Sequence, residues 1–146
     1  VMDTAYYDMV LVSKGLQEVD EYGVLFDPAC VRNLETIIRK TKADIVVTSS
    51  WKYLMSYEEF LEMWNARNLP GFITDTTPNI SNHRGDEIDA WIRECKTECE
   101  YVIIDDLDAN NFNEHHLPHL ITVNPYNGLD EIAVKQAIEI LGMDVS

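Results

Sequence analysis

Two adjacent carboxylates, Asp105 and Asp106, follow directly on the apolar run "YVII". Adjacent carboxylates repel each other unless a cation or hydrogen-bond donors compensate their charge. Mg²⁺ suits such a pair, because it takes one or two carboxylates and keeps positions for water and phosphate oxygens. The abrupt change from apolar to acidic residues therefore favours a metal site over the alternative, a solvated turn in an acidic protein.

Hydroxyl groups end a second apolar run, "IVV", at Thr48, Ser49 and Ser50, and Lys52 follows two residues later. Hydroxyls donate hydrogen bonds and lysine supplies a point charge, so this stretch has the chemistry to bind an anion. Residues of the same types also form ordinary turns into a following helix. The residues alone leave both interpretations open.

Two further groups have weaker signals. Arg84 stands just before an expected helix, where its guanidinium could bind a phosphate with two hydrogen bonds, although an ordinary surface arginine is the simpler interpretation. The segment "NEHHLPH" gathers His115, His116 and His119. Neighbouring side chains in a loop do not naturally converge, and zinc needs further ligands at settled spacing, so we expect no zinc site there.

The segments that carry these residues alternate between helical and strand patterns. Apolar residues at helical spacing predict helices in "FDPACVRNLETIIRKTK", "SYEEFLEMWNAR", "RGDEIDAWIREC" and "LDEIAVKQAIEIL", the first with Asp27 as N-cap and the second with a Ser56–Glu59 capping box. Short apolar runs predict strands in "ADIVVTSS", "YVIIDD" and "HLITVNP". This alternation indicates the α/β class, a Rossmann-like parallel sheet with helices on both faces.

Ligands bind beyond the carboxyl ends of the strands in such sheets. The strands that end at Thr48 and at Asp105 should therefore bring their polar groups to one edge.

Composition limits the remaining possibilities. A chain of 146 residues suits a single domain over 1–146. The 26 acidic and 11 basic residues give a net charge of -15, which repels phosphate backbones, so we expect no broad nucleic-acid binding. No apolar run approaches the ~20 residues of a membrane span. The odd number of cysteines, 3, does not indicate a disulfide framework and favours a reducing, cytoplasmic setting.

The order of these motifs resembles the haloacid dehalogenase (HAD) superfamily of phosphatases. That superfamily has four short motifs at strand ends, and three of them match here: the hydroxyl motif at Thr48, the basic motif at Arg84 and the acidic pair at Asp105 and Asp106. The stretches "SSWK", "RGDEI", "VIIDD" and "NPYNGLDE" look more specifically like the small phosphatase-like domains grouped with bacterial RNA-repair proteins.

The superfamily's first motif, Asp-x-Asp-Gly, supplies the nucleophile and the general acid and base. The opening "VMDT" resembles the continuation of that motif, so both catalytic carboxylates are expected just upstream of Val1. The strand that carries them should be central, between the strands that end at Thr48 and Asp105. Without it, those two strands would face unpaired backbone groups, each costing about 1–3 kcal/mol when buried.

The resemblance implies a Mg²⁺-dependent phosphomonoester hydrolase that works through an aspartyl-phosphate. Asp106 and Asp105 would hold the metal, Thr48 and Ser49 would bind the phosphoryl group, and Arg84 or Lys52 would stabilise its charge. Residues 4–26 fall where the superfamily places a flap or minimal cap, with no separate cap domain.

Three questions remain open at this stage. The substrate is a small phosphate ester or a nucleic-acid end. A catalytically inactive HAD-like binding or regulatory module is an alternative to an enzyme. A response-regulator-like phosphoacceptor is disfavoured, because the strand "LITVNP" ends in Asn124 and Pro125 where that class has a lysine.

Overall fold

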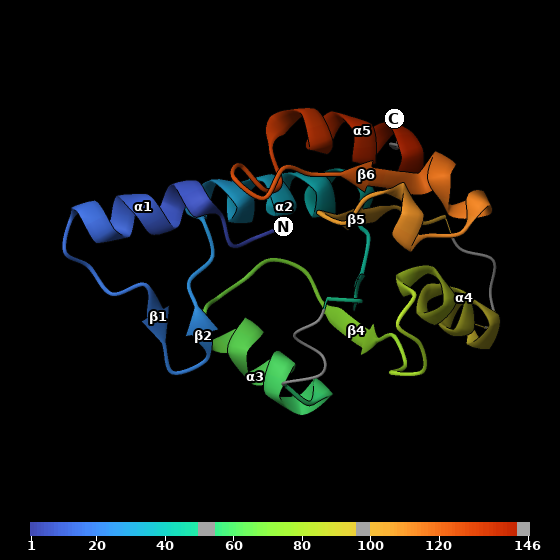
Figure 1. The fold of residues 1–146 in the computed structure, drawn as a ribbon, viewed down its shortest axis with the longest axis horizontal. Helices are drawn as coiled ribbons and strands as arrows, with labels where there is room; N and C mark the ends of the chain where they lie inside the picture. Colours follow the sequence, from blue (N-terminus) through green and yellow to red (C-terminus); the bar gives the residue numbers. More distant parts are fainter. Residues whose placement is uncertain (50–54, 96–99, 143–146) are drawn as a thin grey trace.

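The computed structural model describes residues 1–49, 55–95 and 100–142, so Ser50 and Lys52 lie outside the described residues. The α/β class predicted from the sequence is confirmed, with helices and strands alternating along most of the chain (Figure 1). The elements are α1 (Ala5–Ser13), β1 (Val19–Asp20), β2 (Gly23–Val24), α2 (Pro28–Thr41), β3 (Ile45–Val47), α3 (Tyr57–Ala66), β4 (Ile73–Thr76), α4 (Arg84–Glu94), β5 (Ile103–Asp105), η2 (Ala109–Asn111), η3 (Glu114–His119), β6 (Leu120–Thr122) and α5 (Glu131–Leu141).

The strands form separate pairs rather than one continuous sheet. β3 and β4 are parallel, with Val47 opposite Thr76, and β5 and β6 are parallel, with Asp105 opposite Thr122. Among the described residues no strand joins these two pairs, and β1 and β2 form an antiparallel hairpin of their own. The predicted parallel pairing is therefore confirmed strand by strand, whereas the predicted single sheet is present only in pieces.

Local chemistry explains where the main helices begin. The Asp27 carboxylate accepts the backbone N–H of Ala29 and Pro28 occupies the first turn, so α2 starts where the sequence predicted. Ser56 and Glu59 form the predicted capping box at the start of α3. A backbone in the left-handed conformation at Lys42 ends α2 and turns the chain into β3.

Three groups of buried apolar side chains hold these elements together. The largest lies between α2, α5 and β6, the second between α3 and β4, and the third between α4, β5 and the segment around η2. Their members are Cys30, Ile37, Ile121, Val123, Leu129, Ala133, Val134 and Ala137; Phe60, Met63, Trp64 and Ile73; and Ile88, Ile103 and Phe112. Each strand pair is thus anchored to its own helices.

The N-terminal segment is tied to the largest core by backbone contacts. The carbonyl of Val1 accepts the N–H of Leu129 at 3.0 Å, and the carbonyl of Met2 accepts the N–H of Asp27 at 2.8 Å. Gly128 makes this approach possible, because a Cβ there would lie 2.3 Å from the Val1 carbonyl oxygen and its φ is +62°.

Thr4 connects the starts of two helices. Its hydroxyl donates to the Asp27 carboxylate at 2.8 Å and accepts the N–H of Tyr7, so it caps α1. Both side chains are buried: Thr4 is 1% exposed and Asp27 is 7% exposed.

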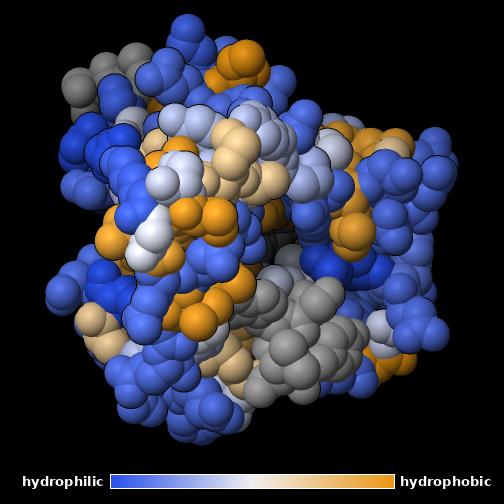
Figure 2. Space-filling model, turned by 60° about the vertical axis from the view of Figure 1, so that its left-hand side comes forward, coloured by the Kyte–Doolittle hydropathy of each residue, from blue (hydrophilic) through white to orange (hydrophobic). Residues whose placement is uncertain are grey.

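Residues 4–26, the segment predicted as a flap, contain α1 and the β1–β2 hairpin. Apolar residues surround α1 on all sides, and several residues of this segment are exposed: Tyr6, Met9 and Val12, followed by Leu16 and Val19. Figure 2 shows separate hydrophobic patches, in orange, between the hydrophilic residues of the face that it turns forward. The hairpin is held by Arg67 at the end of α3, whose guanidinium makes two hydrogen bonds to Asp20, at 2.9 and 2.6 Å. Arg67 also donates to the carbonyl of Gly23 and lies over the Phe26 ring.

None of the helices in the described part of the chain is both long enough and apolar enough to cross a bilayer.

Candidate phosphate and metal site

Thr48 follows β3 directly, and the end of β4 fixes its surroundings. The N–H of Thr77 donates to the carbonyl of Val47 at 2.9 Å, which extends the parallel pairing one residue past β4. The hydroxyl of Thr77 donates to the hydroxyl of Thr48 at 3.2 Å. Thr48 is half-buried and Ser49 is exposed, so both hydroxyls lie at the carboxyl edge of this strand pair.

Asp105 ends β5 and is held on both carboxylate oxygens. Its Oδ2 accepts a hydrogen bond from the Arg84 guanidinium at 2.5 Å, and its Oδ1 accepts the N–H groups of Asp106 at 2.8 Å and Leu107 at 3.2 Å. The residue is 5% exposed. Burial raises the pKa of Asp105 above its ordinary value, and the opposing effect of Arg84 does not cancel this.

Asp106 differs from Asp105 in exposure: Asp106 is exposed, whereas Asp105 is buried. Asp106 lies one residue past β5, and its side chain is still close enough to Asp105 to raise the pKa of that residue, as a smaller cause than burial. Asp105 has donors on both oxygens, whereas Asp106 is open to solvent and to a cation.

Arg84 reaches Asp105 because the start of α4 is tightly packed. A Cβ at Gly85 would lie 2.8 Å from the backbone nitrogen of Asn113, so glycine permits this close approach. Glu87 is 2% exposed and accepts the N–H of Ile80 at 3.0 Å, which fixes the loop that leads into α4. The sequence identified Arg84 as a phosphate contact; in this structure its guanidinium makes an ion pair with Asp105.

The predicted site residues therefore fall into two groups. Arg84, Asp105 and Asp106 lie together at the end of β5, and Thr48 and Ser49 lie at the end of β3, on the other strand pair. Lys52 lies outside the described residues. The meeting of the two groups at one edge stays a prediction.

The expectation that the neighbouring histidines do not converge is wrong for His115 and His116, whereas His119 hydrogen-bonds to the carbonyl of Tyr101 instead. The Nε2 atoms of His115 and His116 both lie 2.7 Å from Oδ1 of Asp89, and the three ligand atoms lie within 4.8 Å of one another, which meets the distance requirement of a metal site. Two features of the fold cause this convergence. The short helix η3 orders the segment, and α4 supplies Asp89, which the sequence analysis missed because it lies 26 residues away from His115.

The hydrogen bonds of this cluster disfavour a metal at His116. Its Nδ1 accepts the N–H of Asn113 at 3.1 Å, so the ring proton is on Nε2 and points at Asp89. A metal-bound histidine normally donates a hydrogen bond from its other ring nitrogen, the reverse of this arrangement. Burial lowers the pKa of His116, which keeps the ring neutral. The cluster thus already has internal partners and ties α4 to η3.

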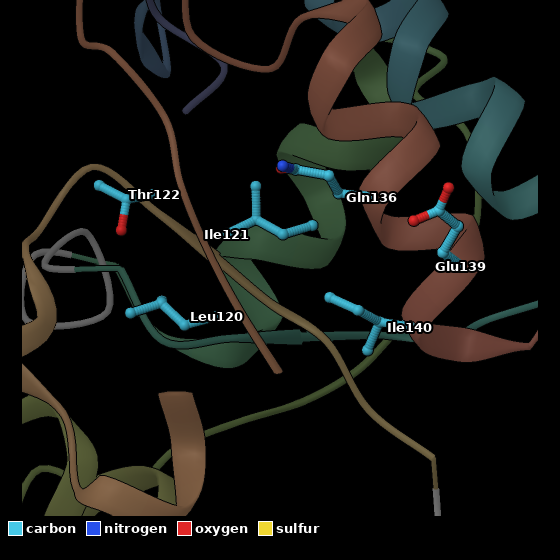
Figure 3. Close-up of a pocket in the computed structure, with 6 residues that line it drawn as sticks. All are labelled: Leu120, Ile121, Thr122, Gln136, Glu139 and Ile140. Atoms are coloured by element: carbon cyan, nitrogen blue, oxygen red, sulfur yellow. The ribbon is translucent and has the colours of Figure 1, made fainter. Parts of the chain in front are cut away.

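The structure has two other features of interest, a pocket and a carboxylate with a shifted pKa. An open pocket of about 330 Å³ is lined by β6 and α5 (Figure 3); its residues are Leu120, Ile121, Thr122, Gln136, Glu139 and Ile140. At the start of α1, burial raises the pKa of Asp3 to about 6, and the nearby charge of Asp8 adds to this shift.

Comparison with known protein families gives a match over most of the chain. A family described as the HAD domain in Swiss Army Knife RNA repair proteins matches residues 7–134, a range that includes both groups of predicted site residues. Comparisons with curated proteins and with solved structures gave no match.

Proposed function

This chain belongs to the HAD domains of Swiss Army Knife RNA repair proteins, and from this premise we propose that it is the phosphatase-type hydrolase domain of its protein. The reaction is the Mg²⁺-dependent hydrolysis of a phosphomonoester. The single observation that carries the proposal is the arrangement at the end of β5. There a buried arginine–aspartate pair stands beside an exposed carboxylate, at the strand end where α/β proteins bind ligands.

The proposed reaction has two steps. An aspartate nucleophile attacks phosphorus, an aspartyl-phosphate forms, and the ester oxygen leaves as an alcohol with a proton from a second aspartate. Water then attacks phosphorus, the second aspartate takes its proton, and inorganic phosphate leaves with the first carboxylate restored.

Other residues of this chain bind and orient the phosphoryl group. Thr48 donates its hydroxyl proton to a phosphoryl oxygen, and Ser49 and Lys52 are further contacts. Arg84, which stands beside the buried Asp105, stabilises the negative charge of the phosphoryl group with its guanidinium.

The two carboxylates of the acidic pair differ in how well they can bind Mg²⁺. Both oxygens of Asp105 already accept hydrogen bonds, whereas Asp106 is exposed. We therefore assign Asp106 as the direct ligand and Asp105 as the group that orients Arg84 and supports the metal shell. When bound, the metal would neutralise the charge on the phosphoryl oxygens.

The family's name places its members in RNA repair, so a phosphorylated nucleic-acid end is one candidate substrate and a small phosphate ester is the other. The net charge of -15 opposes contact with a long phosphate backbone, which favours recognition of a terminal phosphate over binding along a strand.

The test is hydrolysis of p-nitrophenyl phosphate by the natural protein with and without Mg²⁺. Asp106→Asn should lower kcat by about 100-fold and raise the Mg²⁺ concentration for half-maximal rate. Asp44→Asn is the matched control, because it makes the same change at an exposed residue. Asp44 stands just before β3, at the end of that strand opposite to Thr48. Equal rates for the two variants would contradict the role of Asp106. Failure of the natural protein to hydrolyse the ester would favour the inactive binding or regulatory module.

A further inference from the structure

We infer that Thr77 is a positioning residue for Thr48: its buried hydroxyl orients the Thr48 hydroxyl so that the Thr48 proton points at the bound phosphoryl group. The inference rests on the proposed function, since it concerns the phosphate contact of that site. It adds a residue that none of the sequence motifs contains.

The first support is the way Thr77 is fixed. It is 4% exposed, and its N–H is bonded to the carbonyl of Val47 at 2.9 Å. A residue held through its backbone at the end of a parallel strand pair has little freedom to move its side chain. Its hydroxyl therefore stays next to Thr48 whether or not a ligand is present.

The second support is the count of donors and acceptors at Thr48. A hydroxyl has one proton to donate and two lone pairs that accept. The Thr77 hydroxyl donates to Thr48 at 3.2 Å, which fills one of these lone pairs and leaves the Thr48 proton available. Hydrogen bonds in a chain also polarise one another, so an accepted bond makes Thr48 a stronger donor.

The third support is the contrast between the two residues in exposure. Thr77 is buried, whereas Thr48 is half-buried at the strand end, so only Thr48 can meet a ligand from solvent. Thr77 therefore acts through Thr48 and does not touch the substrate.

The experiment compares Thr77→Val, which keeps the shape and removes the hydroxyl, with Thr77→Ser, which keeps the hydroxyl. Binding of inorganic phosphate to the natural protein in Mg²⁺ is measured by calorimetry. We expect Thr77→Val to weaken phosphate binding by about fivefold to tenfold, as for one lost hydrogen bond, and Thr77→Ser to restore most of the affinity. Thr74→Val is the matched control, because Thr74 is on β4, just before Thr77, and its hydroxyl donates to the carbonyl of Ile45 rather than to Thr48.

A double-mutant cycle separates positioning from folding. In a Thr48→Val background, Thr77→Val should have no further effect on phosphate affinity, because the hydroxyl that it orients is gone. Hydrolysis should show the same pattern, with kcat lowered more than KM is raised.

The outcomes distinguish the two proposals. Equal phosphate affinities for Thr77→Val and the natural protein, or additive effects of the two valine substitutions, would overturn the role of Thr77 and leave the proposed function standing. A natural protein that binds no phosphate would overturn the proposed function, and the role of Thr77 with it.

Discussion

The described part of the chain contains two arginine–aspartate pairs that share their chemistry and differ in their surroundings. Arg67 and Asp20 hold the β1–β2 hairpin, with side chains 10% and 33% exposed; Arg84 and Asp105 stand at the candidate site, 13% and 6% exposed. The hydrogen bonds from Arg67 lower the pKa of Asp20, whereas burial raises the pKa of Asp105. The arginine is close in both pairs, so the exposure of the acid decides the direction of the shift.

This difference separates a structural clamp from a candidate functional pair. The ionised Asp20 is stabilised where it lies, and its pair simply joins the hairpin to α3. Keeping Asp105 ionised in a buried position has a cost in desolvation free energy, and the attraction of Arg84 offsets part of this cost. A protein retains such a pair where it has a use for a fixed, buried charge, which agrees with the position of Asp105 at a strand end.

Removal of the site arginine should have the largest effect on stability. Arg84→Ala leaves Asp105 buried without its partner, so we expect the free energy of unfolding to fall by about 3 kcal/mol. Urea denaturation at neutral pH measures this change, with Arg93→Ala on the exposed side of α4 as the control. A loss no larger than that of the control would show that the two pairs do not differ as their burial indicates.

Removal of the hairpin arginine, Arg67, should lower the free energy of unfolding by a smaller amount. Arg67→Ala loses an ion pair with a partly exposed acid and the contact with Phe26, together about 1 kcal/mol. Limited proteolysis should also cut residues 19–24 faster, because the clamp is gone. Arg32→Ala, at an exposed position of α2, is the control for loss of a positive charge. Unchanged cleavage of the hairpin would mean that Arg67 does not hold it.

The pH dependence of the hairpin pair follows from the sign of its shift. The pKa of Asp20 is lowered in the folded protein, so the unfolded chain binds the proton more readily. The contribution of Asp20 to stability is therefore full when the pH is above the ordinary pKa of 3.8, and it is lost as the pH falls below that value. Asp20→Asn should therefore destabilise the protein at neutral pH, and the difference from the natural protein should shrink below about pH 3.8. A difference that grows on acidification would contradict the assigned direction.

The smallest expected effect is the difference between the two pairs in their response to salt. High ionic strength screens exposed charges and acts weakly on buried ones. In 1 M NaCl the destabilisation by Arg67→Ala should therefore decrease, while that by Arg84→Ala should persist. Parallel urea titrations at low and high salt measure both. An equal decrease for the two variants would show that solvent reaches both pairs alike.

The parts of the fold that the sequence predicted are those with a local cause. Asp27 and the Ser56–Glu59 box begin helices where capping chemistry requires, and the parallel strands follow from short β-branched runs. The helix α1 was not predicted, because apolar residues surround it and leave no periodic stripe. The division of the strands into two pairs has no local signal at all.

At the candidate site the sequence identified the reactive residue types and missed their partners. Arg84 and Asp105 were both singled out, yet their bond to each other depends on how α4 packs against η3. Asp89 and Thr77 escaped notice for the same reason, since the residues they contact lie 26 and 29 positions away. Spacing along the chain predicts which groups can react, and only the packed fold decides which of them meet.

The Asp27 carboxylate has one more consequence, for the dynamics of the N-terminal third. One oxygen caps α2 and the other holds Thr4, which caps α1, so a single carboxylate supports the first turns of both helices. The two turns should therefore open together as one cooperative unit rather than fray separately. In native-state hydrogen exchange, the amides of Tyr7 and Ala29 should exchange with the same opening free energy, although one helix lies in the core and the other is largely exposed.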